Sequence, residues 1–188
     1  MKRRTALVAA PLALTAAVHG TRAGAESAHT GQRVSWPDIT LLDGSRWTAG
    51  QWTGHAAVAV FWSITCPFCR RHNQHVEKLF RAASGSALRV LGVARERDAA
   101  AVQRYARQEG YSFPITLDHG ALSAALSSRR MVPLTVTVNR LGHLLQAIPG
   151  EMFEEDVMEL LRLSQLPQLP QLPQSPQLPQ SADKGRRS

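Results

Sequence analysis

The chain has 188 residues, and 44% of them are hydrophobic, which suffices for one packed domain with extensions and excludes a protein that is disordered throughout. The formal net charge is +8, but much of the excess lies in the two end segments, at Lys2, Arg3, Arg4, Arg22, Lys184, Arg186 and Arg187. Because the middle of the chain has no basic stripe with interleaved aromatic residues, we expect no nucleic-acid partner.

The first 25 residues are typical of a secretory signal peptide. A Lys-Arg-Arg start at 2–4 precedes a short apolar run at 5–18, and small residues at 23–25 offer a cleavage site. The apolar run is shorter than the ~20 residues of a membrane span, so we expect membrane anchoring only if the signal is not cleaved. The sequence therefore predicts a periplasmic, or more broadly extracytoplasmic, protein in which 26–33 form a short spacer.

The next segment, 34–163, has the periodicity of one α/β domain. A short strand-like stretch within 37–47 contains Asp43-Gly44, a turn signal that can close a hairpin. The continuous apolar run at 56–62 is typical of a strand buried on both faces of a sheet. We therefore expect a central strand just before the cysteines.

The two cysteines of the chain are three residues apart, in Cys66-Pro67-Phe68-Cys69. A helix is expected to begin at Pro67, because proline is well tolerated at the first helical position. The first sulfur then lies at the helix N-terminus, where unpaired N–H groups and the helix dipole stabilise a thiolate, the reactive form of cysteine. Cys66 is therefore the candidate nucleophile, and Cys69, one turn further, is the candidate resolving thiol.

A Cys66–Cys69 disulfide would close a very short loop and would stabilise the fold little. We therefore expect this disulfide to serve reversible redox chemistry, with no cofactor.

The remaining elements follow in alternation. We expect a helix from Pro67 with Val76, Leu79 and Phe80 on one face, followed by a strand at 88–94 and a helix at 98–108 that ends at Gly110. A short strand at 114–117 and a brief helix at 121–126 come next. Strands at 134–138 and 143–148, joined by a turn at 139–142, and an amphipathic helix at 154–163 complete the domain. The predicted fold class is α/β, with a mixed central sheet flanked by helices.

The segment 164–188 has low sequence complexity. Gln-Leu-Pro repeats along 165–173 and then more loosely to Gln180, and the end is basic. Proline at every third residue favours polyproline II, a semi-rigid spacer without internal hydrogen bonds. We expect a disordered tail, and a proline-rich ligand for a partner protein is the alternative.

A metal site is the main alternative use of the cysteines. Structural zinc would need a second pair of ligands, and the chain has no further cysteine. Cys66, Cys69, His72 and His75 recur every third residue, but steps of three rotate by about −60° around a helix, so four such ligands do not converge on one ion. We therefore expect no such metal site. A copper(I) site on the cysteine pair, as in a periplasmic metallochaperone, stays open as an alternative, and so does a redox-inactive binding domain.

Four motifs occur in order along 34–163: FWSITCPFCR at 61–70, YSFP at 111–114, Val132-Pro133, and NRLGH at 139–143. Their combination resembles the thioredoxin superfamily, and within it the exported TlpA/ResA-like thiol-disulfide oxidoreductases. The resemblance implies a thioredoxin-like fold, catalysis by Cys66 and Cys69, and disulfide exchange with protein thiols. It implies cytochrome c thiols or copper-site cysteines as candidate clients, and a membrane or periplasmic protein as redox partner.

The resemblance also gives a role to Val132 and Pro133. It implies that Pro133 is a cis proline facing the disulfide and that the backbone of Val132 turns toward an extended substrate segment. Both residues are therefore candidates for substrate binding. From the residues alone, the better interpretation of Pro133 is a proline at the start of a strand.

Two positions depart from the family pattern. Many thioredoxins have a buried aspartate six residues before the first cysteine, where this chain has Val60, and relatives commonly have tryptophan where this chain has Thr65. We therefore expect proton transfer through water or through another carboxylate, with Glu151 as a candidate.

Four basic residues follow the motif closely: Arg70, Arg71, His72 and His75. Any cation near the first sulfur would stabilise its thiolate and make the disulfide more oxidising, unless these residues are only solvated helix positions. We predict an intermediate redox potential, between about −120 mV and about −270 mV.

Overall fold

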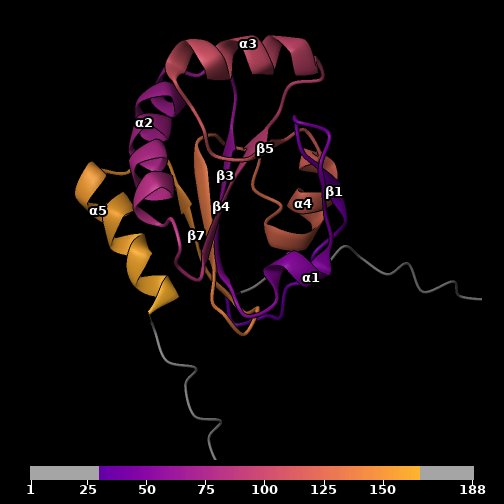
Figure 1. Ribbon diagram of the computed structural model, residues 1–188, viewed down its shortest axis with the longest axis vertical. Coiled ribbons are helices and arrows are strands. Elements are labelled where there is room, and N and C mark those ends of the chain that lie inside the picture. Colours follow the sequence, from indigo (N-terminus) through magenta and orange to yellow (C-terminus); the bar gives the residue numbers. More distant parts are fainter. Residues whose placement is uncertain (1–29, 166–188) are drawn as a thin grey trace, which may run out of the picture.

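The computed structural model of the protein describes residues 30–165 (Figure 1). The predicted signal peptide at 1–25 and nearly all of the predicted tail at 164–188 lie outside the described residues. Between residues 30 and 165, no helix combines the length and the apolar character that a membrane crossing requires.

A five-stranded mixed sheet forms the centre of the domain, with strand order β5-β4-β3-β6-β7. Strands β3, β4 and β5 are parallel, whereas β6 is antiparallel to β3 and β7 is antiparallel to β6. Their bounds are Ala56–Trp62 for β3, Leu88–Ala94 for β4, Ile115–Thr116 for β5, Leu134–Val138 for β6 and Leu144–Pro149 for β7. The predicted α/β class with a mixed sheet is confirmed.

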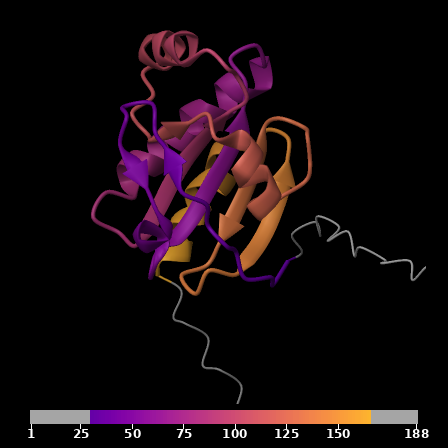
Figure 2. The same cartoon turned by 90° about the vertical axis from the view of Figure 1, so that its right-hand side faces the viewer.

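Helices cover both faces of this sheet (Figures 1 and 2). The helix α2 packs beside α5 on one face, while α4, α1 and the hairpin of β1 and β2 lie on the other. The bounds are Ile39–Thr40 for β1, Arg46–Trp47 for β2, Ala49–Trp52 for α1, Pro67–Ala82 for α2, Ala99–Glu109 for α3, His119–Leu126 for α4, Glu154–Glu159 for α5 and Leu160–Ser164 for the 3₁₀ helix η1.

The strand β3 is buried along its whole length, as the continuous apolar run predicts. Alternate residues point to opposite faces of a strand, so one set of β3 side chains packs under α2 and the other packs under α4. Val58 and Val60 contribute to the first core cluster, and Ala59 and Phe61 contribute to the second. Because β3 is held from both sides, it provides a fixed base for the loop that carries the cysteines.

The short elements differ most from the expected ranges. The hairpin forms as predicted, with Ser45 N–H donating to Asp43 Oδ1 at 2.9 Å across the turn, but each of its strands has only two residues. The predicted helix at 154–163 divides into α5 and η1. The single turn α1 has no counterpart among the expected elements, although Thr48 N–H donates to the Gln51 side chain at 2.7 Å and marks its start.

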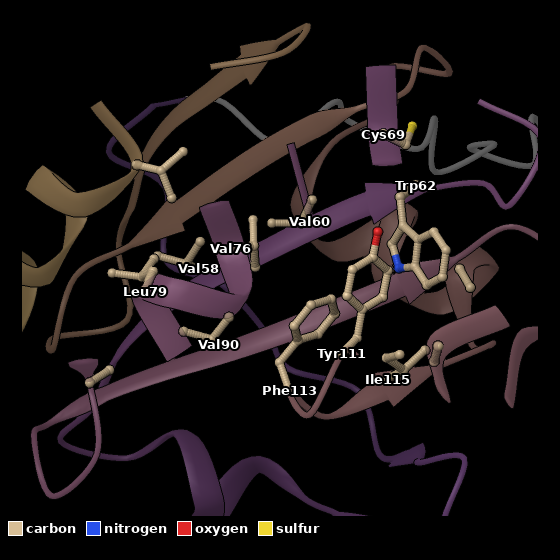
Figure 3. Packing of buried hydrophobic residues seen from close by; sticks show 14 of the residues in the cluster. Val58, Val60, Trp62, Cys69, Val76, Leu79, Val90, Tyr111, Phe113 and Ile115 are labelled. Carbon is tan, nitrogen blue, oxygen red and sulfur yellow. The ribbon is translucent and has the colours of Figure 1, made fainter. Parts of the chain in front are cut away.

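The aromatic side of the core depends on the absence of a side chain at Gly92. A Cβ added there would lie 2.6 Å from Phe113 Cε2 and 3.0 Å from Trp62 Nε1. Figure 3 shows Trp62, Tyr111 and Phe113 close together in this cluster, with Cys69 next to Trp62.

We expect Gly92→Ala to lower the free energy of unfolding by about 1–3 kcal/mol, because the new methyl group overpacks a filled core. Denaturant titration measures this change. Gly120→Ala is the control, because a Cβ at Gly120 meets nothing within 4 Å. Equal stabilities for Gly92→Ala and the unaltered protein would contradict the packing described.

A buried carboxylate joins α2 to the segment before β5. Glu77 Oε2 accepts hydrogen bonds from Ser112 N at 2.7 Å and Phe113 N at 3.3 Å, and Oε1 accepts one from Arg81 Nε at 2.7 Å. Burial alone would raise the pKa of Glu77, but the hydrogen bonds from Ser112 and Arg81 outweigh it and hold the pKa below its usual value.

A lowered pKa in the folded state means that ionised Glu77 stabilises the fold above its unfolded pKa of about 4.3 and that this contribution disappears as pH falls through the folded pKa. We therefore expect Glu77→Gln to be less stable than the unaltered protein at pH 7, with a difference that shrinks below about pH 4. Urea titrations at several pH values measure it. A difference that does not change with pH would contradict the electrostatic role.

Candidate active site

The first cysteine lies where β3 passes into α2. Cys66 is the N-cap of α2, its backbone is extended, and Pro67 occupies the first helical turn. Cys69 N–H donates to Cys66 Sγ at 3.2 Å, so the sulfur takes the place that a capping oxygen has in other helices. The first sulfur therefore lies at the helix N-terminus, where the sequence predicts it.

The two sulfurs differ in accessibility. Both cysteines are free thiols, Cys66 is half-buried, and Cys69 is fully buried. Burial, together with the hydrogen bond to Cys66, raises the pKa of Cys69 to about 12. At neutral pH, Cys69 is therefore a protonated thiol that is shielded from solvent, whereas Cys66 is partly accessible.

The loop before β6 faces Cys66. The Val132–Pro133 peptide bond is cis, and Cys66 Sγ lies 3.8 Å from the carbonyl oxygen of Val132. Pro133 is buried, and its carbonyl accepts a hydrogen bond from Gly150 N at 2.8 Å. The structure thus brings the two predicted substrate-binding residues and the cysteine pair together, although they are more than 60 residues apart in sequence.

One carboxylate beside the cysteines is absent from the expected site residues. Glu96 Oε1 accepts hydrogen bonds from Ser63 Oγ at 2.6 Å and Ile64 N at 2.9 Å. Its Oε2 is buried and has no hydrogen-bond partner among the described residues. The Glu96 carboxylate also contributes to the raised pKa of Cys69, after the larger effects of burial and of Cys66.

Glu96 can be placed at the site once the pairing of β3 with β4 is known. β3 and β4 are parallel neighbours, with Trp62 opposite Ala94, so the residues that follow the two strands meet at one edge of the sheet. Polar residues just after the carboxyl ends of parallel strands are typical of functional sites. Glu96 stands two residues after β4 and meets that description.

Glu151, the carboxylate considered from the sequence, is paired with a cation instead. It accepts hydrogen bonds from Arg71 Nε at 2.8 Å and Arg71 Nη2 at 2.6 Å, and this pairing lowers its pKa. A carboxylate held in this way is a weaker proton acceptor than an unpaired one. Glu96, by contrast, interacts electrostatically with Cys69.

The basic residues of α2 have separate environments. Arg70 Nε bonds Glu109 at 2.8 Å, while Arg71 interacts electrostatically with Cys66 in addition to its pairing with Glu151. His72 is fully buried, and burial lowers its pKa to about 4, so it is uncharged at neutral pH. The expectation that His72 acts as a cation is therefore wrong, and so is the alternative that it is a solvated helix position.

His72 has a structural role in the core. Its Nε2 lies 2.9 Å from Thr135 Oγ1 on β6, and its Nδ1 accepts a hydrogen bond from Met152 N at 3.3 Å. Both ring nitrogens are therefore occupied. Across residues 30–165, no group of three or more His, Cys, Asp or Glu side chains is placed to hold a metal ion.

Comparison with known proteins agrees with this geometry. Residues 30–161 match the Redoxin family. The chain is 29% identical over 122 residues to the thiol-disulfide oxidoreductase ResA of Halalkalibacterium halodurans, covering 65% of this chain and 69% of the relative.

Two solved structures share the fold. One is a putative protein disulfide isomerase from Bacteroides thetaiotaomicron, with a TM-score of 0.66, 22% identity, and coverage of 74% of this chain and 92% of that one. The other is a secreted Mycobacterium tuberculosis disulfide oxidoreductase homologous to DsbE of E. coli, with a TM-score of 0.57, 19% identity, and coverage of 66% and 93%. The chain belongs to the Redoxin family and is a thiol-disulfide oxidoreductase with a thioredoxin-like fold.

Proposed function

We propose that the protein exchanges disulfides with cysteines of other proteins outside the cytoplasm, with Cys66 as the attacking sulfur and Cys69 as the resolving sulfur. The contrast between the two sulfurs carries this proposal. Cys66 is partly accessible at the start of α2, whereas Cys69 is buried with a pKa of about 12. A substrate sulfur therefore reacts with Cys66, and Cys69 then attacks Cys66 Sγ once Cys66 is bonded to the substrate.

In the reducing direction, the Cys66 thiolate attacks one sulfur of a substrate disulfide. The substrate S–S bond breaks, a bond between Cys66 and the substrate forms, and the first substrate sulfur leaves and takes up a proton. Cys69 then loses its proton and attacks Cys66 Sγ, which releases the second substrate sulfur. Two electrons pass to the substrate, and the reverse sequence oxidises two substrate thiols.

The second step needs a proton acceptor for Cys69, and Glu96 fits that role. Its Oε1 is held by Ser63 and Ile64, which leaves the buried, unpartnered Oε2 to receive a proton. A positioned carboxylate acts as a general base of this kind. The carboxylate thus stands on the loop after β4 rather than at the position of Val60.

Exposed apolar side chains beside the cysteines support a protein substrate. Phe68 is 57% exposed and Met131 is 52% exposed, and they are neighbours in sequence of Cys69 and Val132 respectively. Apolar side chains exposed next to a reactive group are typical of a docking surface for a polypeptide. Cytochrome c thiols and copper-site cysteines are the candidate clients, and a membrane or periplasmic protein would recycle the pair.

The extracytoplasmic location rests on two observations. The segment 1–25 is typical of a secretory signal, and a solved relative with the same fold is described as secreted. Disulfides also persist outside the cytosol, where such an enzyme would find its substrates.

We expect Cys69→Ala to trap mixed disulfides, because the bond between Cys66 and a substrate would then have no internal thiol to break it. Non-reducing electrophoresis and mass spectrometry of the variant expressed in cells measure the trapped species. Cys66→Ala is the control and should trap none. If Cys69→Ala forms no mixed disulfide with any protein, the exchange mechanism is wrong.

We expect Glu96→Gln to slow the release of the mixed disulfide by at least about 10-fold at pH 7, because the amide does not accept the proton of Cys69. Rapid mixing with a neutral peptide disulfide, acid quenching and alkylation measure the two steps separately. The difference should shrink as pH rises toward the pKa of Cys69, because hydroxide then removes the proton.

The matched control is Glu155→Gln, which removes an exposed carboxylate from α5. A Glu96→Gln variant that slows both steps equally at every pH would show that Glu96 only supports the 63–64 loop.

A further inference from the structure

A basic cavity lies beside the cysteine site. It has a volume of about 510 Å³ and is bounded by the end of β4, by α4 and by the loop between α4 and β6. Its lining includes Arg95, His119, Arg129 and Arg130, which we call the basic pocket. The loop that carries two of these arginines continues directly into 131–133, the stretch that faces Cys66.

Backbone carbonyls, rather than carboxylates, hold the arginines of the basic pocket. The Arg95 guanidinium donates to the carbonyl oxygen of Arg129 at 3.0 Å and to that of Arg130. Arg129 Nη1 donates to the carbonyl oxygen of Ala147 at 3.2 Å. These contacts fix the shape of the loop, but they leave its positive charge in place.

No ion pair between described side chains includes an arginine of the basic pocket. The acidic neighbours in sequence bind elsewhere, because Glu96 accepts hydrogen bonds from Ser63 and Ile64, and Asp118 Oδ2 accepts one from Thr40 N at 2.7 Å. Burial and the charge of Arg130 both lower the pKa of Arg95. The pocket therefore concentrates positive charge that an added anion would offset.

We propose that the basic pocket binds an aspartate or glutamate side chain of the client polypeptide, close in sequence to the cysteine that Cys66 attacks. This inference rests on the proposed function and names the class of substrate. Arg129 is three residues from Val132, and an extended chain rises ~3.3 Å per residue, so the carboxylate would stand about two to four residues from the client cysteine. Guanidinium groups bind carboxylates through charge-assisted, often bidentate, hydrogen bonds.

A polypeptide suits the position of the pocket better than a free anion does. A client that is bonded to Cys66 and extends past Val132 meets Met131 next, and the arginines immediately after it. Apolar contact at Met131 and charge at Arg130 and Arg129 therefore follow one another along the same direction. The preference would act mainly on the association rate, because complementary charges steer encounter.

Two synthetic peptide disulfides test this inference. They share one sequence around the cysteine, but one has two aspartates three residues away and the other has two serines there. The reduced full chain should reduce the acidic peptide about 10-fold faster at low salt, and the ratio should approach one at 1 M salt, where the screening length is ~3 Å.

Paired variants separate the basic pocket from the net charge. Arg129→Gln combined with Arg130→Gln should lower the ratio of the two rates below about threefold, while the backbone carbonyls that Arg95 binds are retained. Arg104→Gln combined with Arg107→Gln changes the net charge equally on the exposed surface of α3 and should keep the ratio.

Each outcome separates this inference from the proposed function. Equal rates for both peptides, or an equal loss of preference in the two variant pairs, would overturn the basic pocket while leaving disulfide exchange intact. Binding of inorganic phosphate at the pocket without any preference between the peptides would identify a free-anion site and would also overturn it. Failure to reduce either peptide would overturn the proposed function itself.

Discussion

The hydrogen bond from Cys69 N–H to Cys66 Sγ sets the arrangement on which the site depends. It keeps the first sulfur at the N-cap of α2, where the helix dipole favours negative charge, and it holds Cys69, one helical turn later, in the core. The bond forms only if β3 ends and α2 begins at a fixed place. Burial of β3 on both faces provides that fixed place.

The same arrangement makes two identical side chains chemically different. The Cys66 thiol is partly exposed and faces the Val132 carbonyl, whereas the Cys69 thiol packs in the aromatic cluster and interacts electrostatically with Glu96. In the mechanism that we propose, desolvation of Cys69 delays its reaction until a substrate sulfur is bonded to Cys66. In the same proposal, Glu96, on the loop after β4, takes the role that the aspartate at the position of Val60 has in many thioredoxins.

The hydrophobic pattern and the proline positions sufficed to predict the strands and the helix start that depend on residues close together in sequence. The ranges of β3 and β4 agree with the expected strands, and α2 begins at Pro67, because a continuous apolar run and an N-terminal proline are strong local signals. The short turn α1 was missed because one helical turn has no periodicity to read. Glu96 and the basic pocket were missed because their positions depend on which strands are neighbours in the sheet. The spacing of residues along the chain does not reveal the order of the strands.

His72 shows a signal that was present but not used. It stands four residues before Val76 and seven before Leu79, on the same face of α2, so helical periodicity predicts a buried side chain. Its polar type favoured the interpretation as a surface cation. Burial against Thr135 and Met152 decides its charge.

The start of the described chain has a consequence for how the enzyme meets large clients. Gly31 and Val34 donate backbone hydrogen bonds to Leu144 and Gly142, beside the turn between β6 and β7. Since Leu134 pairs with Phe61 and Val138 pairs with Ala57, that turn lies at the pole of the sheet opposite Cys66. The first described residues are therefore held at the end of the sheet opposite the cysteines, and these residues do not cover Cys66.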